Sequence, residues 1–160
     1  MTLDAEVARM ARTRPFSLLP REAVQLIAFS SAKQRLRAGE ILFSAGDAGD
    51  AGYFVQSGAI LLEDRRSPAG SARRATAGAL IGESALYAPV IRRVDARAAE
   101  DALLTRIPRE TFRRVLTEFP DAGDKLRAAL AERMRRLVDG LDATRVRSME
   151  RAPQRSRVPT

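Results

Sequence analysis

The sequence predicts one mainly β domain, a roll or barrel of short strands, with helices at both ends. Eight of its ten glycines lie between residues 39 and 82, where they separate short apolar runs. This pattern is typical of short strands joined by tight turns. On both sides of this stretch, apolar residues recur at helical spacing instead. The length of 160 residues suits one domain with short appendages.

The N-terminal part is expected to form two helices. The first covers residues 2–13, where apolar side chains stand four and three residues apart: Leu3, Val7 and Met10. It ends before Pro15, because a residue that precedes proline disfavours helical backbone. A second, short helix begins at Pro20 and reaches about Ser30, with an apolar side made of Val24, Ile27 and Ala28.

The strands are expected between Lys33 and Ile107. Apolar runs bounded by turn residues mark them: Ile41–Phe43, Tyr53–Val55, Ala59–Leu62, Ala79–Ile81 and Ala102–Ile107. Residues 63–76 are interpreted as a hairpin loop, because Pro68-Ala69-Gly70-Ser71 is a turn sequence.

After Pro108 the apolar spacing becomes helical again. One helix presents Phe112, Val115, Leu116 and Phe119 and is closed by Pro120. A last helix starts near Asp121 and carries a narrow apolar stripe: Leu126, Leu130, Met134, Leu137 and Leu141. Beyond Thr144 the apolar period is lost, which predicts a flexible end. The expected divisions are an N-terminal helix at 1–14, the main domain at 15–144 and an Arg-rich tail at 145–160.

Composition argues for binding rather than catalysis. The chain has no Cys and no His, which removes thiolate nucleophiles, His-based relays and nearly every transition-metal site. We therefore expect neither an enzyme nor a metal protein. Residues 1–14 lack an apolar core run, and no stretch approaches the ~20 apolar residues of a membrane helix. The sequence thus predicts a soluble cytoplasmic protein without a membrane segment.

The positive charge is concentrated at the C-terminus. The whole chain carries 28 basic and 20 acidic residues, a net +8, and residues 145–160 contribute five Arg against one Glu. Such a segment is either a solvated tail or an arm that binds nucleic acid. We favour the solvated tail, because an Ala- and Arg-rich composition produces it without any binding role.

Two glycine-rich signatures stand out. The first, from Gly39 to Ile60, places glycines where tight turns need them, and we interpret it as structural. The second runs Gly78-Ala79-Leu80-Ile81-Gly82-Glu83-Ser84-Ala85-Leu86-Tyr87 and is followed by Arg92-Arg93. A glycine that opens a helical turn lets successive N–H groups converge on an anion, and an Arg fork can complete the pairing. From the residues alone, ordinary surface roles for Glu83 and Arg92 are an equal alternative.

Both signatures, in this order and separation, resemble the cyclic nucleotide-binding domain family, which includes catabolite activator protein, kinase regulatory subunits and nucleotide-gated channels. The resemblance covers roughly residues 16–141. It implies an eight-stranded β-roll with an N-terminal helical segment and C-terminal B and C helices. It also implies a phosphate-binding cassette from Gly82 to Arg93.

The resemblance assigns roles within this cassette. Glu83 would hold the ribose 2′-hydroxyl, and Arg92 would pair with the cyclic phosphate. The N–H groups of Ser84, Ala85 and Leu86 would meet the same phosphate. Arg93 is a second candidate for phosphate contact, although it stands where the family usually has Ser or Thr. Asp95 replaces a small residue and adds negative charge near the phosphate site, where it should share a strand face with Arg93.

These assignments predict a sensor of cAMP or cGMP that signals by moving its C-terminal helix. The alternative is a degenerate fold of the same family that serves as a protein-interaction scaffold without a ligand. The C-terminal helix is expected to mediate a homodimer or to bind a partner protein. About 19 residues follow Leu141, too few for a winged helix-turn-helix, so we expect no DNA-binding domain.

Overall fold

The computed structural model describes residues 2–68 and 71–150, with side chains as far as Leu141. The chain divides into two units, residues 1–123 and residues 124–160. No helix within the described residues is both long enough and apolar enough to cross a membrane.

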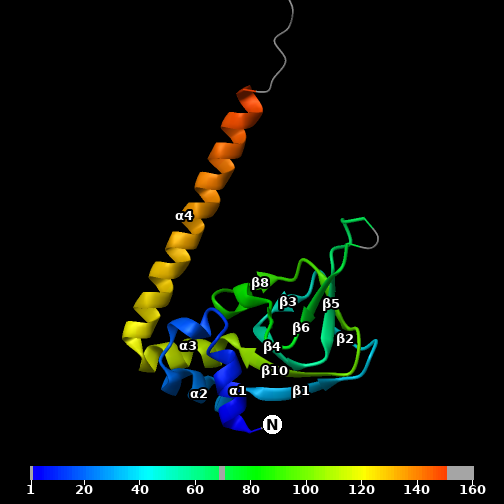
Figure 1. The fold of residues 1–160 in the computed structure, drawn as a ribbon, viewed down its shortest axis with the longest axis vertical. Helices are drawn as coiled ribbons and strands as arrows, with labels where there is room; N and C mark the ends of the chain where they lie inside the picture. Colours follow the sequence, from blue (N-terminus) through cyan, green and yellow to red (C-terminus); the bar gives the residue numbers. More distant parts are fainter. Residues whose placement is uncertain (1, 69–70, 151–160) are drawn as a thin grey trace, which may run out of the picture. The chain divides into compact units, whose positions relative to one another are not determined.

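The first unit is built around antiparallel strands, as predicted (Figure 1). Two four-stranded sheets have the orders β1-β10-β4-β7 and β2-β9-β5-β6, and β3 pairs separately with β8. The described residues thus form ten strands, of which eight lie in the two larger sheets. Their bounds are β1 Ala32–Leu36, β2 Ile41–Phe43, β3 Ala48–Gly49, β4 Ala51–Ser57, β5 Ala59–Glu63, β6 Arg73–Thr76, β7 Leu80–Ile81, β8 Val90–Ile91, β9 Asp95–Ala98 and β10 Ala102–Pro108.

The predicted hairpin is confirmed by the pairing of β5 with β6, which runs from Ala59 opposite Thr76 to Leu62 opposite Arg73. Its loop is shorter than the predicted 63–76, because Glu63 ends β5 and residues 73–76 form β6. Its turn includes residues 69 and 70, which lie outside the described residues. The extra β3–β8 ladder has two residues on each strand, Ala48 and Gly49 opposite Ile91 and Val90. Two-residue strands carry no apolar period, so the sequence did not predict them.

Strand β4 is covered on both of its faces. Tyr53 and Val55 belong to the buried cluster inside the roll, whereas Phe54 packs edge-to-face on Phe16, with ring centroids 6.5 Å apart. Phe16 in turn contacts Phe112 at 6.3 Å. Because side chains alternate along a strand, β4 joins the core of the roll to the packing of the helices.

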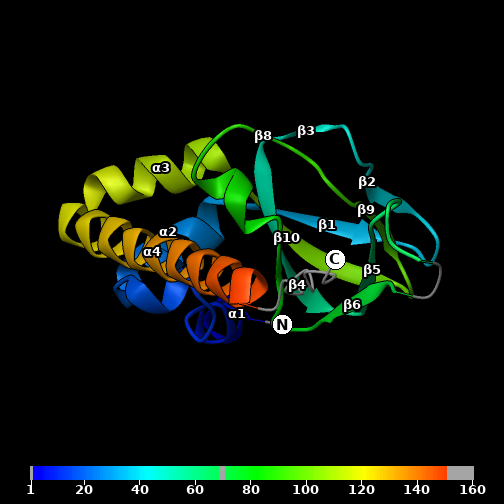
Figure 2. The same cartoon turned by 90° about the horizontal axis from the view of Figure 1, so that it is seen from above.

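The helices of the first unit gather at one end of the strands (Figures 1 and 2). They are α1 Leu3–Met10, the 3₁₀ turn η1 Phe16–Leu18, α2 Arg21–Ser30 and α3 Arg109–Glu118. Thr2 caps α1 by accepting a hydrogen bond from the N–H of Ala5 at 3.3 Å. The predicted apolar sides of these helices are confirmed at Val7, Val24, Ile27, Phe112 and Val115, which are all buried, but Leu3, also predicted on the apolar side of α1, is 43% exposed.

A buried polar network fastens α1 to the strands. Glu6 is only 4% exposed, and its carboxylate accepts hydrogen bonds from Lys33 on β1 and from Thr105 on β10, the latter at 2.7 Å. Gln56 on β4 donates to the same Thr105 hydroxyl at 3.0 Å. Arg9 donates to the backbone carbonyl of Gln56 at 2.6 Å. Hydrogen bonds to three neighbouring strands therefore fix the position of α1, in addition to its apolar packing.

The last helix, α4, spans Pro120–Glu150 and includes the predicted start near Asp121. Along its apolar stripe, Leu126 is buried but Met134, Leu137 and Leu141 are at least 60% exposed. The helix continues past Thr144, where the apolar period ends. Residues 151–160 of the predicted tail lie outside the described residues.

Candidate functional site

Arg92 is the most unusual side chain among the residues that the sequence selected. It follows β8 directly, and its backbone is held by the turn between β2 and β3. Its N–H donates to the carbonyl of Asp47 at 2.8 Å, and its own carbonyl accepts from the N–H of Gly46 at 2.8 Å. The residue is only 7% exposed. Arginine is rarely buried to this extent unless its charge is paired.

The guanidinium group of Arg92 lies against two aromatic rings. Its Cζ atom is 4.4 Å from the centroid of Phe43 and 5.8 Å from that of Tyr53. Nη2 donates a hydrogen bond to the backbone carbonyl of Ala51 at 2.7 Å. These contacts come from β2 and from the first half of β4, so strands of both larger sheets hold the group in place.

Two glycines make room for the same guanidinium. A Cβ atom on Gly82 would lie 2.4 Å from Nη1 of Arg92, and Gly82 has φ +70°, a conformation that other residues adopt at a cost. A Cβ atom on Gly49 would lie 3.0 Å from both Cζ and Nε. Gly49 and Gly82 are therefore needed because the arginine fills the space beside them.

The electrostatic environment of Arg92 favours the binding of an anion. Within the described part of the chain, no carboxylate lies within ion-pair distance of it, and the bond to Ala51 is its only side-chain hydrogen bond. Burial lowers the pKa of Arg92 below its ordinary value, partly offset by Tyr53, Asp50 and Asp47. A buried cation with uncommitted donors is unfavourable unless an acceptor reaches it. Nη1 and Nε remain available for such an acceptor.

The residues expected to form the phosphate cassette are brought together beside Arg92. Gly82 opens η2, a 3₁₀ turn over Glu83–Leu86, so Glu83, Ser84, Ala85 and Leu86 share one turn. The N–H of Ala85 closes this turn by donating to the carbonyl of Gly82 at 3.1 Å. The side chain of Leu86 is fully buried and contributes packing.

Arg93 and Asp95 depart from the expectation that they share a strand face. Residues 92–94 lie between β8 and β9, so the alternation of a strand does not apply there. Arg93 is exposed, whereas Asp95 forms a two-bond ion pair with Arg65, with both N–O distances 2.8 Å. Hydrogen bonds from Arg65 and from the N–H of Ala45 lower the pKa of Asp95. The negative charge of Asp95 is thus directed to Arg65.

The sequence profile of the cyclic nucleotide-binding domain matches residues 33–119, more than half of the chain and the whole of this site. The chain belongs to the cyclic nucleotide-binding domain family. Its relatives include lysophospholipase NTE1 of Chaetomium globosum, 31% identical over 125 residues. These residues are 77% of this chain but 8% of that protein, so the chain spans a small part of the curated relatives that it matches.

Solved structures of other proteins share this fold. A cyclic nucleotide-binding-like protein from Brucella abortus is 31% identical, with a TM-score of 0.64 over 71% of this chain and 99% of that one. The N-terminal domain of a transcriptional regulator from Streptomyces coelicolor is 28% identical, with a TM-score of 0.74 over 83% and 94% of the two chains.

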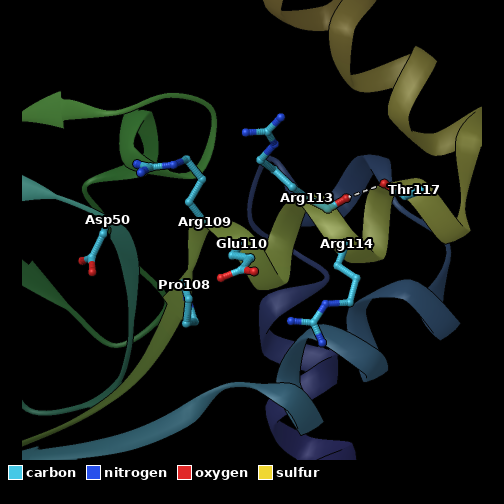
Figure 3. A pocket seen from close by; sticks show the side chains of 7 residues that line it. All are labelled: Asp50, Pro108, Arg109, Glu110, Arg113, Arg114 and Thr117. Carbon is cyan, nitrogen blue, oxygen red and sulfur yellow. Dashed lines mark hydrogen bonds between the residues drawn. The ribbon is translucent and has the colours of Figure 1, made fainter.

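A surface pocket of about 480 Å³ lies elsewhere, along α3 (Figure 3). Its lining comes from α3, from the end of β10 and from the residue that precedes β4: Asp50, Pro108, Arg109, Glu110, Arg113, Arg114 and Thr117. None of these residues belongs to the predicted cassette. Arg113 and Arg114 project to different sides of the helix (Figure 3). Among the described residues, no group of three or more acidic side chains is arranged to hold a metal ion.

Sequence reasoning missed three side chains that shape the site. Phe43 and Tyr53 were treated as strand residues only. Arg109, at the start of α3, places Nη1 at 3.0, 3.2 and 3.1 Å from the carbonyl oxygens of Gly49, Ala85 and Ala88. It thereby ties α3 to β3 and to the cassette. No spacing in the sequence could reveal these contacts, because each joins segments at least 21 residues apart.

Proposed function

We propose that this domain binds cAMP or cGMP and acts as a sensor rather than as an enzyme. The observation that carries the proposal is Arg92, a buried guanidinium with unused donors and no carboxylate within ion-pair distance in the described part of the chain. A cyclic phosphate carries one negative charge and two free oxygen acceptors. It would supply the missing counter-charge without bringing the second charge of a phosphate monoester into a confined site.

The cassette gives this anion further support. With its phosphate on Nη1 of Arg92, the ligand would face the turn that begins at Gly82, and its sugar would approach Glu83. Binding by the N–H of Ala85 requires its hydrogen bond to the carbonyl of Gly82 to be shared or lengthened, so we expect the turn to change conformation when the ligand binds. The family resemblance and the position of η2 support these roles.

The proposal is tested by calorimetry with cAMP, cGMP and 5′-AMP. We expect micromolar or tighter binding of one cyclic nucleotide and weak binding of 5′-AMP, which matches cAMP except for its open, more highly charged phosphate. A bound ligand must also raise the melting temperature, because it binds the native state alone. If neither cyclic nucleotide binds at millimolar concentration, the fold acts as a scaffold instead.

Glu83 is expected to recognise the sugar. Glu83→Ala should weaken binding of cAMP about tenfold, because the ribose 2′-hydroxyl loses its acceptor. The same substitution should leave the affinity for 2′-deoxy-cAMP nearly unchanged. Calorimetry with both nucleotides measures the difference. Equal losses for the two ligands would show that Glu83 acts through the structure of the turn and not through the 2′-hydroxyl.

We propose that the domain signals ligand binding by a movement of α4. Met134, Leu137 and Leu141 form an exposed apolar stripe on this helix. We propose that ligand binding shifts α4 between positions that bury the stripe against different surfaces, one of which is the same stripe of a second copy of the chain. A ligand can shift such populations only as far as its affinities for them differ.

Substitution of the stripe tests this output. Leu137→Asp combined with Leu141→Asp should abolish dimers, because both charges would be buried in the paired seam, while nucleotide affinity is kept. Ala128→Asp, about half a turn around α4 from the stripe, is the control. Light scattering with and without cyclic nucleotide reports the change. A wild-type protein that stays monomeric at high micromolar concentration in both conditions contradicts the dimer.

A further inference from the structure

We propose that Phe43 and Tyr53 are positioning residues that hold the guanidinium of Arg92 in the orientation needed for an anion. This inference rests on the proposed function and adds two aromatic residues to the site. Both rings are almost completely buried, at 8% and 7% exposure, and they come from different sheets, on β2 and β4. Their centroids are 6.1 Å apart with the planes tilted by 36°, so they form one fixed aromatic surface.

The contact involves the charged end of the arginine. The Cζ atom, the centre of the guanidinium, lies 4.4 Å from the Phe43 centroid and 5.8 Å from the Tyr53 centroid, within the ~6 Å range of cation–π attraction. The attraction is strongest where water is excluded, as it is around this 7% exposed residue. Within the described residues, these rings take the place of the carboxylate that usually accompanies a buried arginine.

The rings also decide which edge of the guanidinium is free. With one face covered, the group keeps Nη2 on the carbonyl of Ala51 and Nη1 beside Gly82. The free donor Nη1 therefore lies beside the cassette turn, whereas Nε lies beside Gly49 of β3. A carboxylate in place of the rings would neutralise the charge and compete with a phosphate, whereas an aromatic face stabilises the cation and leaves its in-plane donors unused.

A double-mutant cycle tests the coupling between ring and cation. Phe43→Leu should weaken binding of the preferred cyclic nucleotide about tenfold in the wild-type background, because the guanidinium loses its orientation. In an Arg92→Gln background, which removes the charge but keeps a planar polar group, Phe43→Leu should change the affinity less than twofold. Weak affinities in that background are measured by NMR titration at millimolar ligand.

Matched variants separate this effect from a damaged core. Phe54→Leu removes a fully buried ring from the opposite face of β4 and should leave affinity within twofold of wild type. Tyr53→Phe keeps the ring and should retain affinity, whereas Tyr53→Leu should not. If Phe43→Leu weakens binding equally in both backgrounds, or has no effect in the wild type, the inference is overturned.

A second measurement needs no nucleotide. In protein labelled with ¹⁵N at arginine, the NMR signal of the Arg92 Nε–H proton should show an upfield ring-current shift. This shift should disappear in Phe43→Leu and persist in Phe54→Leu. An unshifted signal in the wild type would overturn the inference even if nucleotide binds. Failure of the wild type to bind any cyclic nucleotide would instead overturn the proposed function, and the NMR result would still decide whether the rings hold the guanidinium.

Discussion

Arg92→Ala should weaken the binding of cAMP or cGMP by about 2–4 kcal/mol, roughly 30- to 700-fold in affinity. The substitution removes a buried, charge-assisted donor pair from the phosphate. The unused donor Nη1 of Arg92 already lies beside Gly82, so we expect the loss to fall on binding itself and not on reorganisation of the site. Calorimetry at fixed salt measures the change.

Arg93→Ala is the matched control for this substitution, because it removes the same side chain from the next residue. Arg93 is exposed, so we expect its loss to change affinity less than threefold. A larger loss at Arg93 than at Arg92 would show that the phosphate is held outside the buried site. The melting temperature of each variant, measured without ligand, shows whether the fold is retained.

The largest loss of stability is expected for Gly58→Ala, at the turn between β4 and β5. The new Cβ atom would lie 2.2 Å from the carbonyl oxygen of Asp101 and 2.6 Å from Cα of Ala102, both backbone atoms. Gly58 also has φ +83°, which an L side chain rarely adopts. Strain and displacement of the β9–β10 connection together should lower the free energy of unfolding by about 3–5 kcal/mol.

Gly78→Ala separates the two contributions. Gly78 has φ +93°, but nothing lies within 4 Å of the added Cβ atom, so only backbone strain applies. We expect a loss of about 1 kcal/mol, since the substitution also reduces the entropy of the unfolded chain. Urea unfolding gives both values. Similar losses at the two positions would mean that the chain near Asp101 moves aside at little cost.

The sequence predicted the fold well where side-chain periods are long. The helices α1, α2, α3 and α4 each carry an apolar side over at least two turns, and each of the five apolar runs overlaps a strand, namely β2, β4, β5, β7 or β10. It did not predict β1, β3, β6, β8 and β9, none of which contains an apolar run of three residues, because pairing there depends on neighbours that are distant in the chain. The sequence also did not predict that α4 continues beyond Thr144 to Glu150, because the apolar period is lost there.

For the site, the motif located the cassette and selected Arg92 over Arg93, and the structure places Arg92 in the interior. It could not show that Arg92 rests on Phe43 and Tyr53 or that Arg109 binds the cassette carbonyls. Phe43 and Arg92 are 49 residues apart, and every roll contains aromatic strand residues. Phe43 and Tyr53 belong to the site because the fold brings β2, β4 and the β8–β9 connection together.

The buried network around Glu6 has a practical consequence for chemical labelling. The chain contains only two lysines, Lys33 and Lys125, and no cysteine. The amine of Lys33 is engaged by Glu6 and Thr105, whereas Lys125 is exposed on α4. Acylation of the Lys33 amine would break its ion pair with Glu6 and its hydrogen bond to Thr105, which disfavours reaction at this residue. An amine-directed fluorophore should therefore react with Lys125 in preference to Lys33, and a dye on Lys125 would report optically on the environment of α4.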